Sequence, residues 1–456
     1  MSLDWLLQRF EKAGHIPAII ERDEEFSYAW LAARVTFWRN EFGSIGINSG
    51  SVVALQTAFS GDGCALLLAL ADYGCISVPI SISGSAQIER SCSLAEVEFL
   101  WRVGSNGAWD CTRVGKLPGH PLTLSIIERG LPGLILFSSG STGECKAALH
   151  DLTKLLKKFE TRRPAMRTLA FLLFDHIGGL NTMFHVFANG GTLVLADDRT
   201  PDQIASLIER HRVQLLPTTP TFLNLLLMSE AQLRHDFSSL CWVTYGTEPM
   251  GKSTLLRLTQ ALPHVRFSQT YGLSELGILS SKSEASDSLR MRIGGEGFET
   301  KVQNGTLWIR ADSAMLGYLN APWPFDCDGW FNTEDVVDID GDFIQVMGRR
   351  SDVINVGGEK VFPIEVEDVI QDLPNIKEVI VSGEPNSITG QTIVAYIQPN
   401  EPEDIISLRR RIRVACAERL APFKIPTRVQ LSTEQVTSAR FKKLRRTSIP
   451  VEVLAT

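Results

Sequence analysis

The sequence lacks the features that mark several common protein classes. None of its eight cysteines lies in a CxxC motif or another paired spacing, which argues against a disulfide framework and a zinc ribbon. The longest apolar run, Cys64–Ala71, is far shorter than the roughly 20 residues that cross a bilayer. No basic tip precedes an apolar stretch at the N-terminus, as a secretory signal requires. We therefore expect a cytoplasmic protein with free thiols and no membrane span.

Other motifs are missing too. There is no His/Cys ligand cluster and no Gly-x-Ser-x-Gly, so zinc enzymes and serine hydrolases find no support. The net charge of -7 argues against nucleic acid as a partner. The charge is unevenly placed, because twelve Lys or Arg but only two acidic residues lie between Arg409 and Arg446. This basic tail is either a solvated face or a landing site for phosphates or an acidic partner.

The 456 residues exceed what one ordinary hydrophobic core supports, so two or more domains are expected. Residues 1–50 are predicted as helix, turn and helix. Short β-type runs then flank an apolar helical stretch, a βαβ pattern that predicts parallel sheet. The expected strands are Val52–Leu55, Cys75–Ile80, Leu134–Phe137 and Thr192–Leu195, and the expected helices are Gly63–Asp72, Pro201–His211, Pro220–Met228 and Lys252–Leu262.

After about residue 290 the pattern changes to short strands with turns, and a final unit begins near residue 349. The strands expected here are Gly305–Arg310, Val336–Ile339, Phe343–Met347, Glu378–Val381 and Thr392–Gln398, with helices at Pro363–Asp372 and Glu403–Glu418. We predict an α/β protein with a large N-terminal body of several subdomains and mixed or parallel sheets, residues 1–348. A small, mobile α+β C-terminal cap is expected at residues 349–456.

Four segments carry the chemistry. The first, Ser138-Ser-Gly-Ser-Thr-Gly-Glu-Cys-Lys146, follows a predicted buried strand, and its backbone N–H groups, hydroxyls and lysine suit phosphate oxygens. It is not a Walker loop, because the glycine spacing differs. The second, Gln269–Glu275, offers a tyrosine for stacking and a carboxylate for Mg²⁺. The third is Gly329–Asp335. The fourth runs from Gly348 through Gly357-Gly358 to Pro363-Ile-Glu-Val-Glu367.

Each segment is a weak or moderate signal alone, but their order and spacing together are specific. From about Phe26-Ser-Tyr28 to the basic tail, the sequence resembles the adenylate-forming superfamily, which includes acyl- and aryl-CoA synthetases, adenylation domains and beetle luciferases. The resemblance implies that ATP and Mg²⁺ activate a small-molecule carboxylic acid as an acyl-adenylate. The acyl group would then pass to a thiol, that of coenzyme A or of a carrier protein.

The resemblance also implies site residues. Those for ATP or AMP are Ser138, Ser139, Gly140, Ser141, Thr142, Gly143, Lys146, Gly246, Thr247, Tyr271, Gly272, Asp335 and Arg349. Catalytic roles fall to Lys146, Ser274, Glu275 and Lys442. Within these sets, Tyr271 would stack on adenine, Ser274 touch the α-phosphate and Glu275 bind Mg²⁺. Asp335 and Arg349 would hold the ribose. Lys442 would bridge the carboxylate and the α-phosphate.

The remaining roles concern the acyl group, the thiol and the cap. The acyl pocket would be formed by Asp175, His176, Gly178, Tyr245, Gly246 and Gly277. The run His-Ile-Gly-Gly-Leu resembles aryl-CoA ligases with the histidine beside the acyl group, whereas Asp175 would suit a substrate ammonium. The glycines at 178 and 179 are interpreted as room for a flat aryl or extended acyl group. Gly357 and Gly358 would line the thiol tunnel, and Ser351 would be the hinge.

Three positions depart from the family pattern. Cys145 replaces a proline, Glu334 replaces the glycine of Thr-Gly-Asp, and Phe441 replaces the glycine before the last lysine. Lys443 lies one step from that lysine and competes with Lys442 for the assignment. Three hypotheses follow. The first is an acid–CoA ligase for an aryl or fatty acid. The second is a standalone adenylation enzyme that loads an aryl or amino acid onto a carrier protein. The third is a degenerate nucleotide-binding homologue without turnover.

Overall fold

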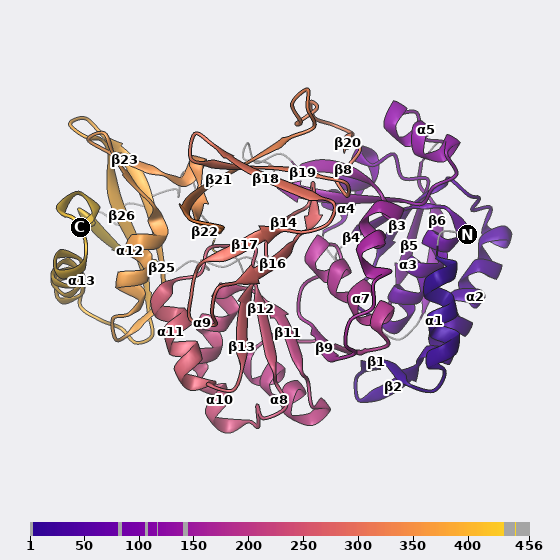
Figure 1. Ribbon diagram of the computed structural model, residues 1–456, viewed down its shortest axis with the longest axis horizontal. Helices are drawn as coiled ribbons and strands as arrows, with labels where there is room; N and C mark the ends of the chain where they lie inside the picture. Colours follow the sequence, from indigo (N-terminus) through magenta and orange to yellow (C-terminus); the bar gives the residue numbers. More distant parts are fainter. Residues whose placement is uncertain are drawn as a thin grey trace.

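Two seven-stranded sheets form the N-terminal body of the chain (Figure 1). The first is mixed, with a parallel centre (β7-β4-β3-β5) and antiparallel edges, and the second is parallel apart from its β1–β2 edge. The computed structural model describes residues 3–80, 84–104, 108–115, 117–139, 145–432 and 443. The first sheet has the spatial order β6 (Trp109–Arg113), β5 (Phe99–Val103), β3 (Val52–Gln56), β4 (Ile76–Ile80), β7 (Gly133–Ser139), β8 (Cys145–Asp151) and β20 (Gly317–Tyr318). The second has the order β2 (Glu24–Ser27), β1 (Pro17–Glu21), β10 (Thr192–Leu195), β9 (Arg167–Ala170), β11 (Leu215–Thr218), β12 (Trp242–Tyr245) and β13 (Arg266–Gln269).

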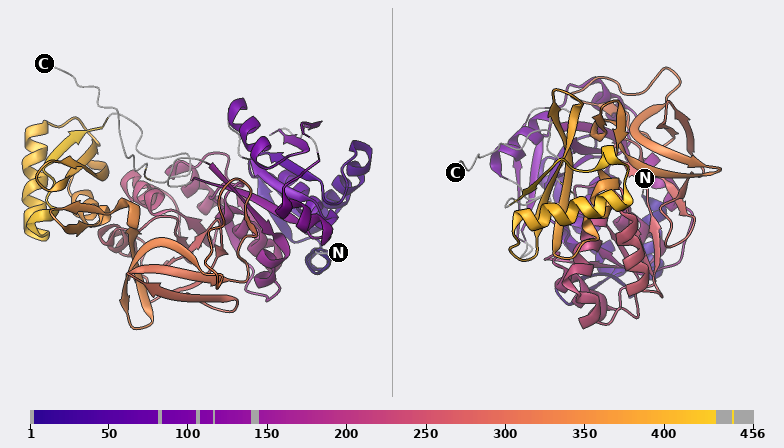
Figure 2. Two further views of the ribbon diagram at one scale, coloured as in Figure 1. Left: turned by 90° about the horizontal axis from the view of Figure 1, so that it is seen from above. Right: turned by 90° about the vertical axis from the view of Figure 1, so that its left-hand side faces the viewer.

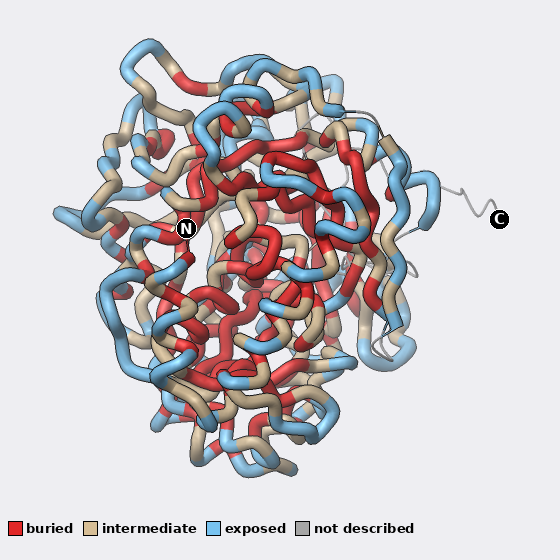
Figure 3. Tube along the Cα trace, turned by 90° about the vertical axis from the view of Figure 1, so that its right-hand side faces the viewer, coloured by how far each residue is buried: buried red, intermediate tan, exposed pale blue. Residues whose placement is uncertain are grey.

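Helices cover the faces of these sheets, as parallel strands require. They are α1 (Asp4–Ala13), α2 (Tyr28–Ile45), α3 (Gly61–Tyr73), α4 (Ser85–Leu94), α5 (Pro121–Glu128), α6 (Leu152–Leu156), α7 (Ile177–Asn189), α8 (Pro201–His211), α9 (Pro220–Ser229), α10 (Ala231–Arg234) and α11 (Lys252–Ala261). Helix α3 is apolar on nearly all sides and almost wholly buried, because it lies inside the body. Figure 3 shows this buried interior from the side.

Local sequence explains where several of these helices begin and end. The Ser60 hydroxyl accepts a hydrogen bond from Gly63 N at 3.0 Å, and α3 ends at Gly74 with a φ of 81°. Helix α8 begins with Pro201 at its first position, where the missing N–H costs nothing, and its range equals the predicted one.

The prediction for residues 1–50 is wrong in one respect. Between the two helices lies the antiparallel hairpin of β1 and β2, which joins the edge of the second sheet. Its tight turn is Arg22-Asp23, and both residues have positive φ, 49° and 67°. The hairpin was missed because such turns are usually marked by Asn-Gly or Asp-Gly, and neither dipeptide is present here.

An antiparallel six-stranded sheet follows the body, as the change of pattern near residue 290 predicted. Its strands, in spatial order, are β16 (Ser280–Ser283), β17 (Met291–Gly294), β22 (Phe343–Arg349), β21 (Phe331–Asp340), β19 (Thr306–Ala311) and β18 (Phe298–Gln303). A small ribbon of β14 (Gly272–Leu273) and β15 (Gly277–Ile278) precedes it. Strand β22 runs out of this sheet toward the last unit of the chain.

The C-terminal unit is a separate small sheet with its own core. It contains β23 (Ile354–Val356), β24 (Glu359–Val361), β25 (Ile376–Asn386), β26 (Gly390–Pro399) and β27 (Arg428–Leu431), with helices α12 (Pro363–Gln371) and α13 (Ile405–Arg419). Its buried side chains form a cluster of their own. Figure 2 shows the unit, in yellow, at one end of the molecule. The predicted α/β class with a large body and a small α+β unit is confirmed.

One contact between the C-terminal unit and the body is a helix cap. Helix α11 begins after Gly251, which has no side chain to cap it. Asp368, on α12 of the C-terminal unit, supplies the missing acceptor. Its Oδ1 accepts hydrogen bonds from Ser253 N at 3.0 Å and from Ser253 Oγ at 2.7 Å. A carboxylate at a helix N-terminus also interacts favourably with the helix dipole.

We expect Asp368→Ala to lower the free energy of unfolding by about 1 kcal/mol, because the substitution removes an N-terminal helix cap. The control is Asp342→Ala. Asp342 is 81% exposed and lies 3.8 Å from Arg292, so its loss should cost less than about 0.5 kcal/mol. Thermal unfolding of the two variants compares them. Equal shifts in the midpoint would show that the cap contributes nothing.

Candidate active site

A cleft of about 680 Å³ lies where the C-terminal unit faces the body. The body contributes α9, the loop after β12, the N-terminal end of α11 and the loop after β13, and α12 and β22 close the other side. Six of the residues predicted to bind ATP line this cleft: Gly246, Thr247, Tyr271, Gly272, Asp335 and Arg349. Residues from four distant parts of the sequence are therefore brought together.

A buried carboxylate lies in this cleft. Asp335 is 7% exposed and accepts a hydrogen bond from the Tyr271 hydroxyl, while Arg349 Nε lies 3.6 Å from its other oxygen. Burial raises the pKa of Asp335, and the tyrosine and the guanidinium oppose that rise. Burial and the neighbouring carboxylate raise the pKa of Tyr271 well above its usual value. The phenol therefore stays protonated and donates a hydrogen bond to Asp335.

The predicted Gly246-Thr247 pair lies where the backbone makes a close approach. A Cβ at Gly246 would lie 2.6 Å from the Thr270 carbonyl oxygen, so only glycine fits there. Thr247 has a φ of 74°, which a β-branched residue rarely adopts. Such strain persists where surrounding structure enforces it, and it is frequent in binding sites.

A second cluster gathers the predicted phosphate-side residues around a tyrosine that the sequence analysis did not single out. The Tyr318 hydroxyl donates a hydrogen bond to Glu275 Oε1 at 2.7 Å, and Lys146 Nζ lies 5.2 Å from the centre of its ring. Burial raises the pKa of Tyr318, Glu275 adds to the rise, and a hydrogen bond with Ser138 opposes it. Tyr318 reaches this cluster because β20 pairs with β8, with Tyr318 opposite Ala148, and the sequence does not show a strand pairing of this kind.

Part of the predicted set lies outside the described residues, namely Gly140, Ser141, Thr142, Gly143 and Lys442. Ser139 ends β7, where it pairs with Cys145 at the last step of the hairpin ladder. The Cys145 carbonyl also accepts a hydrogen bond from Asn320 Nδ2 at 2.8 Å. Cysteine in place of the family's proline therefore stands in a regular, hydrogen-bonded strand. Ser274 is half-buried on the loop between Tyr271 and Glu275.

The predicted acyl-pocket residues do not share the cleft, apart from Gly246. His176 caps helix α7, because its Nδ1 accepts a hydrogen bond from Gly178 N at 3.1 Å. Burial lowers the pKa of Arg199, and the charge of the nearby Asp175 opposes that decrease. Tyr245 is 1% exposed and belongs to a hydrophobic core cluster. Gly277, with a φ of 83°, is the first residue of β15, where it pairs with Leu273 of β14.

The interpretation of the two glycines at the start of α7 as room for an acyl group is wrong. A Cβ on Gly179 would lie 2.0 Å from the Leu173 carbonyl oxygen, so the protein's own backbone fills that space. A Cβ on Gly178 would lie 2.7 Å from the Leu172 side chain and 3.1 Å from the His176 ring. Both glycines are explained by close packing and do not indicate the shape of a substrate.

The residues predicted for the hinge and the thiol tunnel do not line the cleft. Ser351 lies in a short, exposed 3-10 turn, Arg350–Asp352, between β22 and the C-terminal sheet. Gly357 and Gly358 form the exposed turn between β23 and β24, with φ values of 62° and 94°, and no atom lies within 4 Å of a Cβ built on either. Their conformation requires glycine, and it leaves the turn open to solvent.

Glu334 fits beside the cleft without displacing its neighbours, although its charge adds to the rise in the pKa of Asp335 that burial causes. Its side chain is exposed, and its φ of 61° is the left-handed conformation that a glycine at this position would adopt easily. The flanking residues remain in place, because Thr333 Oγ1 donates to the Leu307 carbonyl at 2.8 Å and accepts from Asp335 N at 3.1 Å. The departure from Thr-Gly-Asp is thus accommodated by the backbone.

The effect of a substitution at Glu334 on the free energy of unfolding should depend on backbone strain. We expect Glu334→Gly to stay within about 1 kcal/mol of the original stability, because relief of the left-handed strain is offset by the chain entropy of glycine. Glu334→Val should destabilise by about 1–3 kcal/mol, because a β-branched residue tolerates positive φ poorly. Urea denaturation followed by fluorescence measures both. A valine variant as stable as the glycine variant would contradict this explanation.

Comparisons with known proteins agree with this arrangement. Residues 123–319 match the family model described as AMP-binding enzyme, and residues 365–442 match that of the AMP-binding enzyme C-terminal domain. Among curated proteins, the chain is 24% identical to a 2-succinylbenzoate–CoA ligase of Listeria monocytogenes, with 98% of each chain covered. It is 27% identical to another from Bacillus licheniformis, with 93% of this chain and 94% of the other covered.

Solved structures show the same fold. An anthranilate CoA ligase in complex with anthranoyl-AMP aligns with a TM-score of 0.81 at 20% identity, covering 96% of this chain and 95% of the other. The o-succinylbenzoate CoA synthetase of Bacillus subtilis, in complex with its acyl-adenylate, aligns with a TM-score of 0.78 at 20% identity, covering 97% of both. The two family models together span more than half of the 456 residues. The chain therefore belongs to the AMP-binding enzymes, the adenylate-forming superfamily that its motifs resemble.

Proposed function

We propose that the protein is an AMP-forming acid–thiol ligase, which activates a carboxylic acid with ATP and transfers the acyl group to coenzyme A. The observation that carries the proposal is the gathering of Gly246, Thr247, Tyr271, Asp335 and Arg349 in one cleft. A tyrosine ring, a buried carboxylate and a guanidinium beside exposed backbone suit a purine nucleoside. Membership of the AMP-binding enzymes supports the same nucleotide.

The first half-reaction forms the acyl-adenylate. An oxygen of the substrate carboxylate attacks the α-phosphorus of ATP, the bond to the β-phosphate breaks, and pyrophosphate leaves with that bond's electrons. Lys146 and Lys442 offset the negative charge that develops on the phosphates, and Ser274 orients the α-phosphate. Catalysis of this kind consists largely of positioning and electrostatic stabilisation. Asp335 and Arg349 hold the ribose so that the α-phosphate meets the carboxylate.

Glu275 fits a role as the protein's Mg²⁺ ligand. Within the described ranges, no group of three or more His, Cys, Asp or Glu side chains is arranged to hold a metal ion. Mg²⁺, however, commonly takes one or two carboxylates and completes its shell with substrate phosphates and water. Tyr318 donates to one Glu275 oxygen and so fixes the carboxylate. A bound Mg²⁺ would supply positive charge to the departing pyrophosphate.

The second half-reaction would use another position of the C-terminal unit. The thiol sulfur attacks the acyl carbonyl, a thioester bond forms, and AMP leaves. We propose that residues 349–456 move as a cap about Ser351, which lies in the short turn between two sheets. That motion would bring the open Gly357-Gly358 turn to the thiol arm. Glycine suits this task, because it leaves the backbone accessible.

We infer the substrate class from the relatives and from the charges beside Asp175. We infer a small-molecule aryl or fatty acid, since relatives named for 2-succinylbenzoate and long-chain fatty acids align over nearly the full chain. The positive charge of Arg199 near Asp175 disfavours the alternative in which that carboxylate holds a substrate ammonium. His176, fixed as the cap of α7, would stand beside the acyl group.

Among helices in the described ranges, none has the length and apolarity to cross a membrane.

Acid-dependent exchange of labelled pyrophosphate into ATP tests the first half-reaction. We expect exchange with at least one acid from a panel of aryl, fatty and amino acids, and the strongest signal from an aryl or fatty acid. The measurement is radioactivity in ATP against acid concentration. A chain that exchanges with no acid across the panel would be the degenerate homologue. Supplying coenzyme A and a carrier protein in parallel then separates the proposed ligase from a carrier-loading enzyme.

Lys442→Ala should separate the two half-reactions. We expect the variant to lose acid-dependent exchange by about two to three orders of magnitude, because it removes a positive charge from the site of nucleotidyl transfer. Thioester formation from a supplied acyl-adenylate should continue, because the lysine belongs to the adenylating position only. Chromatography of the thioester and isotope exchange give the two rates. Equal losses in both steps would show that Lys442 is misassigned.

A further inference from the structure

Lys443, the residue that competes with Lys442 for the adenylation role, has its side chain held by a buried carboxylate. Its Nζ lies 3.0 Å from Glu367 Oε2, and the Glu367 side chain is 1% exposed. Glu367 lies on α12 of the C-terminal unit, and its other oxygen accepts a hydrogen bond from Val381 N at 3.0 Å. Breaking a buried ion pair leaves an uncompensated charge, which is costly. The Lys443 ammonium is therefore committed to this pair.

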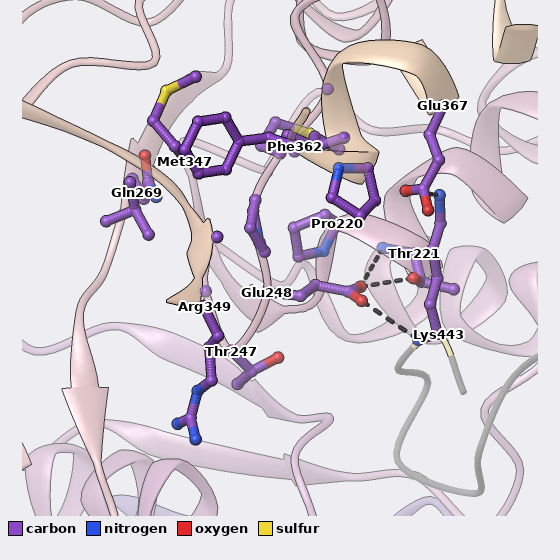
Figure 4. Close-up of a pocket in the computed structure, with 18 of the residues that line it drawn as sticks. Pro220, Thr221, Thr247, Glu248, Gln269, Met347, Arg349, Phe362, Glu367 and Lys443 are labelled. Carbon is purple, nitrogen blue, oxygen red and sulfur yellow. Dashed lines mark hydrogen bonds and ion pairs between the residues drawn. The ribbon is translucent and has the colours of Figure 1, made fainter. Parts of the chain in front are cut away.

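The backbone of Lys443 is held from the other side of the cleft (Figure 4). Lys443 N donates a hydrogen bond to Glu248 Oε2 at 3.2 Å. Glu248 is itself fixed by the body, because its Oε1 accepts hydrogen bonds from the backbone and the hydroxyl of Thr221 in the first turn of α9. Glu248 directly follows Gly246-Thr247, so this contact lies beside the proposed nucleotide site.

The surroundings of Lys443 are acidic. Asp368 and Glu378 line the same cleft as Glu248 and Glu367. Burial raises the pKa of Glu378, the Lys443 ammonium opposes the rise, and Glu248 adds to it. A lysine from the basic tail thus enters a cleft whose walls are negatively charged. The sequence analysis expected phosphates or an acidic partner for this tail, and the acidic partner of Lys443 belongs to the same chain.

We propose that Glu248 and Glu367 are positioning residues, which together form a clamp that seats Lys443 and so holds the C-terminal unit against the body in the adenylating position. The proposal rests on the proposed function. The hydrogen bond from Lys443 N fixes the backbone at this residue, and the ion pair with Glu367 fixes its side chain. The clamp spans both units of the chain, since Glu248 belongs to the body and Glu367 to the C-terminal unit. It therefore acts only while the two units face each other.

The clamp predicts a loss confined to one half-reaction. Glu248→Gln, Glu367→Gln and Lys443→Met should each lower acid-dependent pyrophosphate exchange about ten-fold or more, because a small misplacement of a catalytic group is costly. Thioester formation from a supplied acyl-adenylate should keep its original rate. Both rates are measured on the full-length protein with the acid that gives the strongest exchange.

The matched control is Glu365→Gln. Glu365 lies on the same helix and makes an ion pair of 2.7 Å with Lys424 inside the C-terminal unit, but it does not line the cleft. This variant should keep both rates. Equal loss in both half-reactions for the clamp variants, or no loss in exchange, would overturn the clamp.

A conservative variant guards against variants that merely fold poorly. Lys443→Arg keeps a cation beside Glu367 and should retain more of the exchange than Lys443→Met, because the buried carboxylate stays paired. Equal loss in the arginine and methionine variants would count against the clamp. An original protein without acid-dependent exchange would overturn the proposed function and the clamp together. Exchange that is normal in the original protein and in all three clamp variants would overturn the clamp alone.

Discussion

The whole arrangement depends on carboxylates that join the C-terminal unit to the body. Asp368 caps a body helix, Glu367 pairs with Lys443, and Glu248 holds the backbone of the same lysine from the body side. These contacts are polar, and each unit keeps a hydrophobic core of its own. Two units joined in this way can separate without exposing a core. The cleft and the proposed alternation between two half-reactions both follow from that constraint.

The charged groups of the proposed site fall into two neighbouring regions, one for the nucleoside and one for the phosphates. On one side, Asp335 is buried with Tyr271 and Arg349, where a nucleoside would meet an aromatic ring and a carboxylate. On the other, Lys146 stands over the Tyr318 ring beside Glu275, where phosphates and a cation would lie. The loop from Tyr271 to Glu275 joins the two regions, so a single short segment sets the spacing between nucleoside and phosphates.

Much of this could be predicted from sequence, and the exceptions have physical causes. Helix α8 was located correctly because Pro201 marks its start and its apolar residues have helical spacing. The β1–β2 hairpin was missed because Arg22-Asp23 is not a typical turn sequence. Glu248 was not singled out and Glu367 was quoted only as the end of a motif without a role, because only the approach of two units makes them cleft walls. Gly178 and Gly179 were misinterpreted because a sequence does not show which backbone lies against a missing Cβ.

The central claim is that this protein makes an acyl-adenylate from ATP and an acid. Rapid acid quenching of the protein with ATP, Mg²⁺ and its best acid, without any thiol, tests it most directly. The account predicts that enzyme-bound acyl-AMP accumulates to about one equivalent per chain and disappears when coenzyme A is added. Release of ADP and phosphate, or the absence of acyl-AMP while ATP is consumed, would contradict the account.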